Sequence, residues 1–177
     1  MTSIHKYLLQ AMDNYPYNLE DTLESLDFAL SYDENNTMVL CLYGRMYAEQ
    51  LQQYEEAKAC FQKALSINVN AIEIYPYYIE TLLFNEDFEE AEKLIAFALT
   101  VKGIRKIDIK WREVLLYEMR TDLENALQLA KQLKLYTFDS GWNGTIRETI
   151  KRLKQKIKIV YGEDDTEKPE KNTAKKK

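Results

Sequence analysis

The side chains that most often perform catalysis are scarce in this chain. Its 177 residues include one histidine, His5, and two cysteines, Cys41 and Cys60, which lie 19 positions apart. A catalytic triad or a histidine-based metal site needs more than His5 can offer, and neither cysteine has a second cysteine or a histidine at metal-ligand spacing. We therefore predict that the protein is not an enzyme and holds no metal or cofactor.

Two further patterns that could carry chemistry have structural explanations. The carboxylate pairs Glu55-Glu56 and Glu89-Glu90 occupy equivalent positions near the starts of predicted helices, where negative charge favours the helix dipole. The five glycines include no phosphate-binding loop, because Gly141-Trp-Asn-Gly144 lacks the lysine and hydroxyl residue that would follow. Neither pattern indicates a substrate site.

A short motif recurs along the chain at a period of 34 or 35 residues. Tyr54-Glu-Glu-Ala57 is followed by Phe88-Glu-Glu-Ala91 and by the looser Leu123-Glu-Asn-Ala126, and Leu19-Glu-Asp-Thr22 precedes it at the same spacing. A period of this length is typical of stacked helical hairpins, each of which buries its apolar face against its neighbours. We predict four hairpins between residue 1 and about residue 136.

The composition and the apolar spacing predict an all-α protein. Only 5 glycines and 3 prolines occur, and no alternating strand pattern is found between turn signals. The first helix should end before Asn14-Tyr-Pro16, and the others are expected over 19–32, 37–51, 54–67, 71–85, 88–101, 105–119 and 122–135. Residues 139–144 are rich in turn formers and are predicted to be a loop.

The second copy of the motif resembles the tetratricopeptide repeat. The residues that carry the resemblance are Leu40, Tyr43, Gly44 and Tyr47 on the first helix and Ala57, Phe61 and Ala64 on the second. One departure is that Gly44 and Ala57 are one residue further apart than in the family. The resemblance implies a right-handed α-solenoid of about four hairpins over residues 1–136, closed by a C-terminal capping helix over 143–161.

In that family the first helix of each hairpin lines a concave groove that binds protein segments. The resemblance implies that the groove residues are Cys41, Leu42, Arg45, Ala48, Glu49, Glu73, Tyr77, Glu80, Leu83, Phe84, Arg112, Glu113, Leu116, Met119 and Arg120. The candidate anchors among them are Tyr77, Leu83, Phe84, Leu116 and Met119. Some members hold the C-terminal carboxylate of chaperones, but Glu73 and Glu80 would repel such a ligand.

Charge is divided unevenly along the chain. Residues 1–100 hold 5 Lys/Arg and 17 Asp/Glu, whereas residues 101–177 hold 19 and 12. Because sequence order is spatial order in a solenoid, we expect one acidic and one basic end, which could drive head-to-tail self-association. The predicted capping helix has an apolar seam (Ile146, Ile150, Leu153, Ile157, Val160) and is otherwise basic (Arg147, Lys151, Arg152, Lys154, Lys156, Lys158). The charged tail, 162–177, is expected to be disordered.

These features favour a non-catalytic protein-interaction module: an adaptor, scaffold or assembly factor with a protein or peptide partner. The alternative is a nucleic-acid-associated or regulatory protein that uses the basic helix. Direct binding of nucleic acid is disfavoured, because the whole chain is acidic and aromatic residues do not alternate with the basic ones. With no signal segment and no apolar stretch of about 20 residues, we expect a cytoplasmic protein with no membrane partner and with reduced thiols at Cys41 and Cys60.

Overall fold

The computed structural model describes residues 3–137 and 140–162, and within them it contains helices and no strand. The helices are α1 (Ser3–Asn14), α2 (Leu19–Tyr32), α3 (Thr37–Arg45), α4 (Tyr54–Ile67), α5 (Ile74–Phe84), α6 (Phe88–Ala98), α7 (Lys106–Met119), α8 (Leu123–Leu133) and α9 (Ser140–Tyr161). A π-helical turn, η1 (Met46–Gln50), follows α3, and a short 3₁₀ turn, η2 (Lys134–Tyr136), follows α8.

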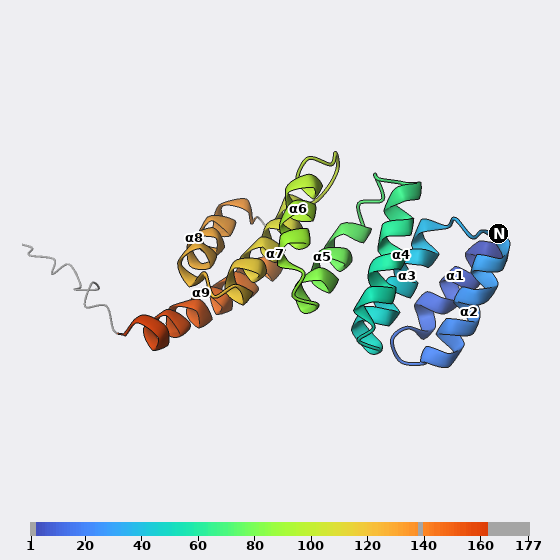
Figure 1. Cartoon of the computed structure of the whole chain (residues 1–177), viewed down its shortest axis with the longest axis horizontal. Helices are drawn as coiled ribbons and strands as arrows, with labels where there is room; N and C mark the ends of the chain where they lie inside the picture. The colour runs from blue at the N-terminus through green and yellow to red at the C-terminus, as the bar shows by residue number, and fades with distance from the viewer. Residues whose placement is uncertain (1–2, 138–139, 163–177) are drawn as a thin grey trace, which may run out of the picture.

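The helices form an elongated array in chain order, with α1 and α2 at one end and α9 at the other (Figure 1). Among the described residues, the apolar core consists of three successive clusters along this array. Each hairpin therefore shares its buried face with the next, as a solenoid requires. The all-α prediction is confirmed, while the division of the chain at residues 136 and 143 stays a prediction.

The repeated motif marks the point at which the two helices of each hairpin meet. Its fourth residue is Thr22, Ala57, Ala91 or Ala126 in the successive copies, and all four are fully buried. Only a small side chain fits where two helices approach closely, and these residues stand one turn after the start of α2, α4, α6 and α8. The motif thus recurs in the sequence because the same close contact between two helices recurs in each hairpin.

The turn inside the hairpins repeats as well. Gln52, Glu86 and Thr121 have φ angles of 55°, 60° and 61°, and each stands two residues before the next helix. A positive φ is uncommon for residues with a side chain and is strained for a β-branched one such as Thr121. The recurrence of this angle shows that the α3/α4, α5/α6 and α7/α8 hairpins share one turn conformation, which the α1/α2 hairpin does not adopt.

In the second hairpin an aromatic ring packs directly against a glycine. A Cβ atom added at Gly44 on α3 would lie 2.7 Å from two ring carbons of Phe61 on α4. Phe61 is fully buried and its ring stacks on Tyr78 at a centroid distance of 5.6 Å, so a shift of the ring would disturb this packing. Glycine is therefore required by packing at this position.

The π-helical turn accounts for the extra residue between Gly44 and Ala57. Within η1 the amide of Leu51 donates to the carbonyl of Met46, five residues back, at 3.3 Å. A π-turn holds one residue more than an α-helical turn, so the helix absorbs the insertion without losing the register of α4. The helix predicted over 37–51 is thus continuous in space, but its last turn is wound differently.

Helix α9 packs on the last hairpin and caps the array. Ile146 and Leu153 are buried among residues of α7 and α8, whereas Val160 is exposed, so the apolar seam is covered only as far as Ile157. The prediction of a loop over 139–144 is wrong from Ser140 onward, because α9 begins there. Asp139 and the predicted disordered tail beyond Gly162 lie outside the described residues.

A buried carboxylate attaches α9 to α7. Arg152 donates to both oxygens of Glu118, at 2.9 and 2.7 Å, and the Lys156 ammonium donates to one of them at 2.7 Å. Burial alone would raise the pKa of Glu118, but these two cations outweigh it and hold the pKa below its usual value. Glu118 is therefore ionised at neutral pH, and α9 is fixed by charge as well as by its seam.

We expect Glu118→Gln to lower the free energy of unfolding at pH 7 by about 1–2 kcal/mol, because charge-assisted hydrogen bonds are lost at a buried site. The folded-state pKa is lowered, so the contribution is present above the usual carboxylate pKa and is lost as pH falls through the lowered value. Urea unfolding from pH 7 to pH 3.5 should show the difference shrinking. Glu148→Gln, at an exposed site on α9, is the control. An equal deficit at both pH values would contradict this role.

Candidate partner-binding groove

Three adjoining hollows lie along the inner helices α1, α3, α5 and α7. The first has a volume of about 330 Å³ and lies between Arg45 and Phe84. The second, of about 130 Å³, is bounded by Met12, Leu42 and Glu73. The third, of about 410 Å³, reaches Arg112 and Trp142. Tyr77 lines all three, so the hollows form one groove with Tyr77 at its centre.

A cation and two aromatic rings build the middle of the groove. The Arg45 guanidinium lies 4.2 Å from the ring centroid of Tyr77 and 4.9 Å from that of Tyr15. Its Nε donates to Glu49 at 2.9 Å, and the Tyr15 hydroxyl donates to the other oxygen of Glu49 at 2.5 Å. Burial alone would lower the pKa of Arg45, but the Glu49 carboxylate outweighs it and raises the pKa. Arg45 is thus a fixed charge, and it holds the face of Tyr77.

A second guanidinium in the groove is also fully engaged within the protein. Arg112 donates from Nε to the carbonyl of Pro76 at 2.8 Å and from Nη1 to the carbonyl of Asp108 at 2.9 Å. It also pairs with Glu80 at 3.1 Å. These contacts join α5 to α7 and leave little of the cation for a ligand.

The charge that remains in the groove is negative. Four carboxylates line the three hollows, Glu49, Glu73, Glu80 and Asp108, against the two guanidinium groups of Arg45 and Arg112. In the described part of the chain Glu73 forms no ion pair, although it lines two of the hollows. An added cation would find a partner there, whereas an added carboxylate would be repelled.

The hollows bring together most, but not all, of the residues assigned to the groove from the sequence. The side chains that line them are Cys41, Leu42, Arg45, Ala48, Glu49, Glu73, Tyr77, Glu80, Phe84 and Arg112. Leu83 and Leu116 do not line the hollows, because both are buried in the core with an exposure of 1%. The prediction that these two leucines are groove anchors is therefore wrong.

In the fourth hairpin, most of the residues predicted to line the groove lie elsewhere. Arg120 points to the outer helix of the third hairpin, where it pairs with Glu92 at 2.7 Å, and Glu113 pairs with Lys110 at 3.2 Å. Met119 is 39% exposed but lines none of the three hollows. Of the α7 residues assigned from the sequence, Arg112 lines the third hollow, together with Asp108 and Trp111, which were not assigned.

Two tryptophans that the sequence did not assign to the groove form its far wall. The rings of Trp111 on α7 and Trp142 on α9 meet edge to face at a centroid distance of 5.6 Å, and both line the third hollow. Trp142 could not be assigned to the groove from the sequence, because residues 139–144 are predicted to form a loop. The turn formers of this segment instead occupy the first turns of α9.

The cysteines show no sign of a reactive centre. Cys41 and Cys60 are free thiols, and burial raises the pKa of Cys41 to about 12. A thiol with so high a pKa is protonated at neutral pH and is a poor nucleophile. Within residues 3–137 and 140–162, no group of three histidine, cysteine, aspartate or glutamate side chains could hold a metal ion.

The described helices include none that is both long and apolar enough to cross a bilayer.

On the basic helix, the cations differ in their surroundings. Arg152 and Lys156 are bound to Glu118. Arg147, Lys151 and Lys158 are exposed and have no ion pair in the part of the chain that the structure describes, and Lys154 is exposed as well. Part of the positive charge predicted for this surface is therefore neutralised by α7.

Comparison with known proteins shows which solved structures have a similar fold. No protein-family model matches the chain, and no curated protein matches it by sequence. Among solved structures, the MamA RS-1 ArsTM double mutant aligns with a TM-score of 0.62 at 14% identity, over 88% of this chain and 97% of that one. A crystal structure of MamA aligns at 0.61 and 13%, over 92% and 97%.

A third similar structure is Naa15/Naa10 bound to HypK-THB, with a TM-score of 0.50 at 15% identity. The alignment covers 90% of this chain but only 31% of the longer chain that it matches. At these identities the likeness concerns the fold alone. It supports a solenoid of tetratricopeptide-like hairpins.

Proposed function

We propose that this tetratricopeptide-like solenoid is a non-catalytic protein-interaction module that holds a segment of a partner protein in its concave groove. The observation that carries the proposal is the junction of three hollows at Tyr77. A continuous groove with a central aromatic ring suits an extended or helical segment better than a small metabolite, which is normally enclosed in a single cavity. An adaptor, scaffold or assembly factor would act in this way.

Apolar contact would supply most of the binding energy. The Phe84 side chain is 61% exposed at the edge of the first hollow, and the Tyr77 ring is held flat against Arg45. Large aromatic side chains that are already fixed lose little entropy when a partner covers them, so they are the usual centres of binding energy at interfaces. We assign the anchoring role to Tyr77 and Phe84.

Charge would select the partner segment. Because Arg45 and Arg112 are engaged by Glu49 and Glu80 while Glu73 has no ion pair, the groove favours a segment with a lysine or arginine next to an apolar side chain. The same arrangement argues against a C-terminal carboxylate as the ligand. One of the solved structures with this fold, Naa15/Naa10 bound to HypK-THB, is itself a protein complex, which supports an interaction role.

The alternative function, contact with nucleic acid through the basic helix, receives less support. Glu118 engages Arg152 and Lys156, so fewer cations remain to neutralise phosphates than the sequence suggests. Among the exposed residues of α9 in the described part of the chain, Tyr161 is the one aromatic side chain near the cations, so there is no series of rings on which successive bases could stack.

Affinity capture from the cells that produce the protein tests the groove directly. The captured proteins should be compared, by quantitative mass spectrometry, among the unchanged chain, a Tyr77→Ala/Phe84→Ala variant and a control. Tyr17→Ala is a matched control, because Tyr17 is 93% exposed and lies outside the groove. We expect the groove variant alone to lose its specific partners. Equal recovery by all three proteins would contradict the proposal.

A further inference from the structure

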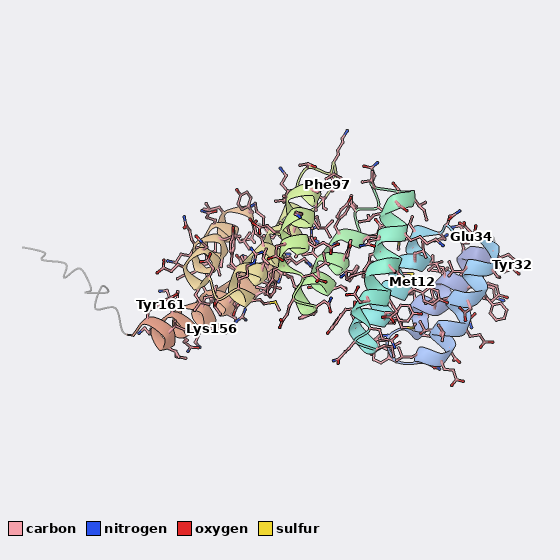
Figure 2. All side chains as sticks on the ribbon, in the orientation of Figure 1. Met12, Tyr32, Glu34, Phe97, Lys156 and Tyr161 are labelled. Carbon is pink, nitrogen blue, oxygen red and sulfur yellow. The ribbon has the colours of Figure 1, made fainter. Side chains whose placement is uncertain are left out.

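The apolar seam of α9 continues past the surface that the last hairpin covers. Ile157 is partly buried against α7 and α8, but Val160 and Tyr161 are 61% and 63% exposed, and Ile159 is 82% exposed. Figure 2 shows Tyr161 at the end of the molecule opposite Tyr32. Consecutive helix residues point about 100° apart, so these three side chains do not share one face, and Tyr161 is the one that lies beside the exposed cations of α9.

A basic stripe runs along α9 beside Tyr161. Arg147, Lys151 and Lys158 stand four and then seven residues apart, which places them on one face of the helix, and Lys154 shares that face. This face is distinct from the side on which Arg152 and Lys156 reach Glu118. The stripe is exposed along its length.

At the other end of the molecule, α2 carries an acidic stripe with matching spacing. Glu20 and Glu24 stand four residues apart on the exposed face of α2, as Arg147 and Lys151 do on α9. Asp27 continues the stripe and also accepts a hydrogen bond from the Tyr43 hydroxyl. No carboxylate of α1 or α2 pairs with a lysine or arginine in the described part of the chain. Three exposed apolar side chains flank the stripe: Leu23, Phe28 and Tyr32.

We propose that α9 of one copy docks along the outer face of α2 of a second copy. The basic stripe would lie against the acidic stripe, and Tyr161, which flanks the basic stripe on α9, would cover the apolar side chains beside the acidic one. Residues 1–36 hold seven carboxylates against one lysine, so the acidic stripe lies in a region of excess negative charge. On α9, Arg152 and Lys156 are held by Glu118 on another side, and the exposed stripe offers Arg147, Lys151 and Lys158 as partners.

The position of the two surfaces determines the kind of assembly. Tyr32 and Glu34 lie at one end of the molecule and Lys156 and Tyr161 at the other, so the contact cannot close within one chain (Figure 2). A contact between two different surfaces of the same molecule is head-to-tail and adds copy after copy unless a ring closes. The residues of the proposed contact line none of the three hollows, so this proposal is independent of the proposed function.

The contact should be weak and sensitive to salt. Helix α2 has 14 residues and is therefore about 21 Å long, so a single helix pair buries less surface than a permanent interface does. Exposed charges lose most of their attraction at about 0.5 M salt, where the screening length is only a few ångströms. Association should accordingly appear at high protein concentration and low ionic strength.

Charge reversal on each surface in turn provides the test. In an acid-side variant, Glu20→Lys and Glu24→Lys make α2 basic; in a base-side variant, Arg147→Glu and Lys151→Glu make the stripe of α9 acidic. A control, Glu89→Lys with Glu124→Lys, makes the same charge change as the acid-side variant on exposed residues of α6 and α8. Sedimentation equilibrium measures the mass, and a carbodiimide cross-links carboxylates to lysines that touch.

We expect the unchanged protein and the control to exceed twice the monomer mass of 20.9 kDa at low salt and to dissociate at high salt. Each reversed variant alone should be monomeric, and an equal mixture of the two should associate again. Cross-links should join Glu20 or Glu24 to lysines of α9, which can arise only between copies. A monomer under all conditions, a mixture that fails to associate, or a mass that saturates at a dimer linked α9 to α9 would overturn the proposal.

Discussion

Gly44→Ala should lower the free energy of unfolding by up to about 2 kcal/mol, although alanine is the better helix former. The added methyl group would lie 2.7 Å from the ring of Phe61, which is fully buried and stacked on Tyr78. Overpacking of this kind costs about 1–3 kcal/mol, whereas the gain in helix propensity is about 1 kcal/mol. Packing should therefore outweigh propensity in urea unfolding followed by circular dichroism.

Gly144 on α9 provides the matched control. A Cβ atom there would meet nothing within 4 Å, so Gly144→Ala should be neutral or stabilise the protein by up to about 1 kcal/mol. Adding Phe61→Leu to Gly44→Ala should recover part of the loss specific to Gly44, because the smaller side chain relieves the contact. If the two glycine variants changed stability equally, close packing of α3 on α4 would not be the reason for glycine at position 44.

Tyr77→Ala should weaken the binding of a partner segment by at least about tenfold, since buried aromatic anchors at interface centres contribute about 2 kcal/mol or more. Tyr77 lines all three hollows and its ring supports Arg45, so its removal also leaves the guanidinium free to move. Titration calorimetry with a captured partner measures the change.

Tyr77→Phe distinguishes the contribution of the ring to binding from that of the hydroxyl group. The phenyl ring keeps its place under Arg45, and we expect it to bind almost as the tyrosine does, because the contact with the cation is made by the ring face. Circular dichroism should show both variants folded. Full affinity in folded Tyr77→Ala would show that the partner binds elsewhere.

The helical repeat could be predicted because its signal lies in residues whose size packing restricts. Ala57, Ala91 and Ala126 recur at a fixed period and are all fully buried, and the same is true of Thr22. Aromatic positions such as Phe61 followed from the resemblance and prove to be core residues. Local patterns of this kind need no knowledge of distant contacts.

The details of the groove depend on contacts that no local pattern records. Leu83 and Leu116 have the same apolar character as a groove anchor, and only the rotation of α5 and α7 in the array places them in the core. In the sequence nothing distinguishes Glu118 from an exposed glutamate, because its partner Arg152 stands 34 residues later, on α9. Trp142 reaches the groove because α9 begins at Ser140, despite the glycines of its first turns.

The π-helical turn shows how a departure from the repeat can matter. The one-residue insertion between Gly44 and Ala57 was visible in the sequence, but its location was not. The structure places it at Met46–Gln50, the turn that carries Glu49 to Arg45 and Tyr15. Turns of this kind occur often at functional sites, and the Ala48 and Glu49 side chains of this one line the first hollow of the groove.

A photo-reactive amino acid placed at position 84 tests most directly whether partners occupy the groove. The comparison is the same amino acid at position 136, because Phe84 and Tyr136 are exposed to similar extents, 61% and 57%, but Tyr136 lies outside the three hollows. After irradiation in the producing cells, we expect a covalently linked partner from position 84 and none of that partner from position 136. Linkage from position 136 alone, or the same partner from both positions, would contradict binding in the groove.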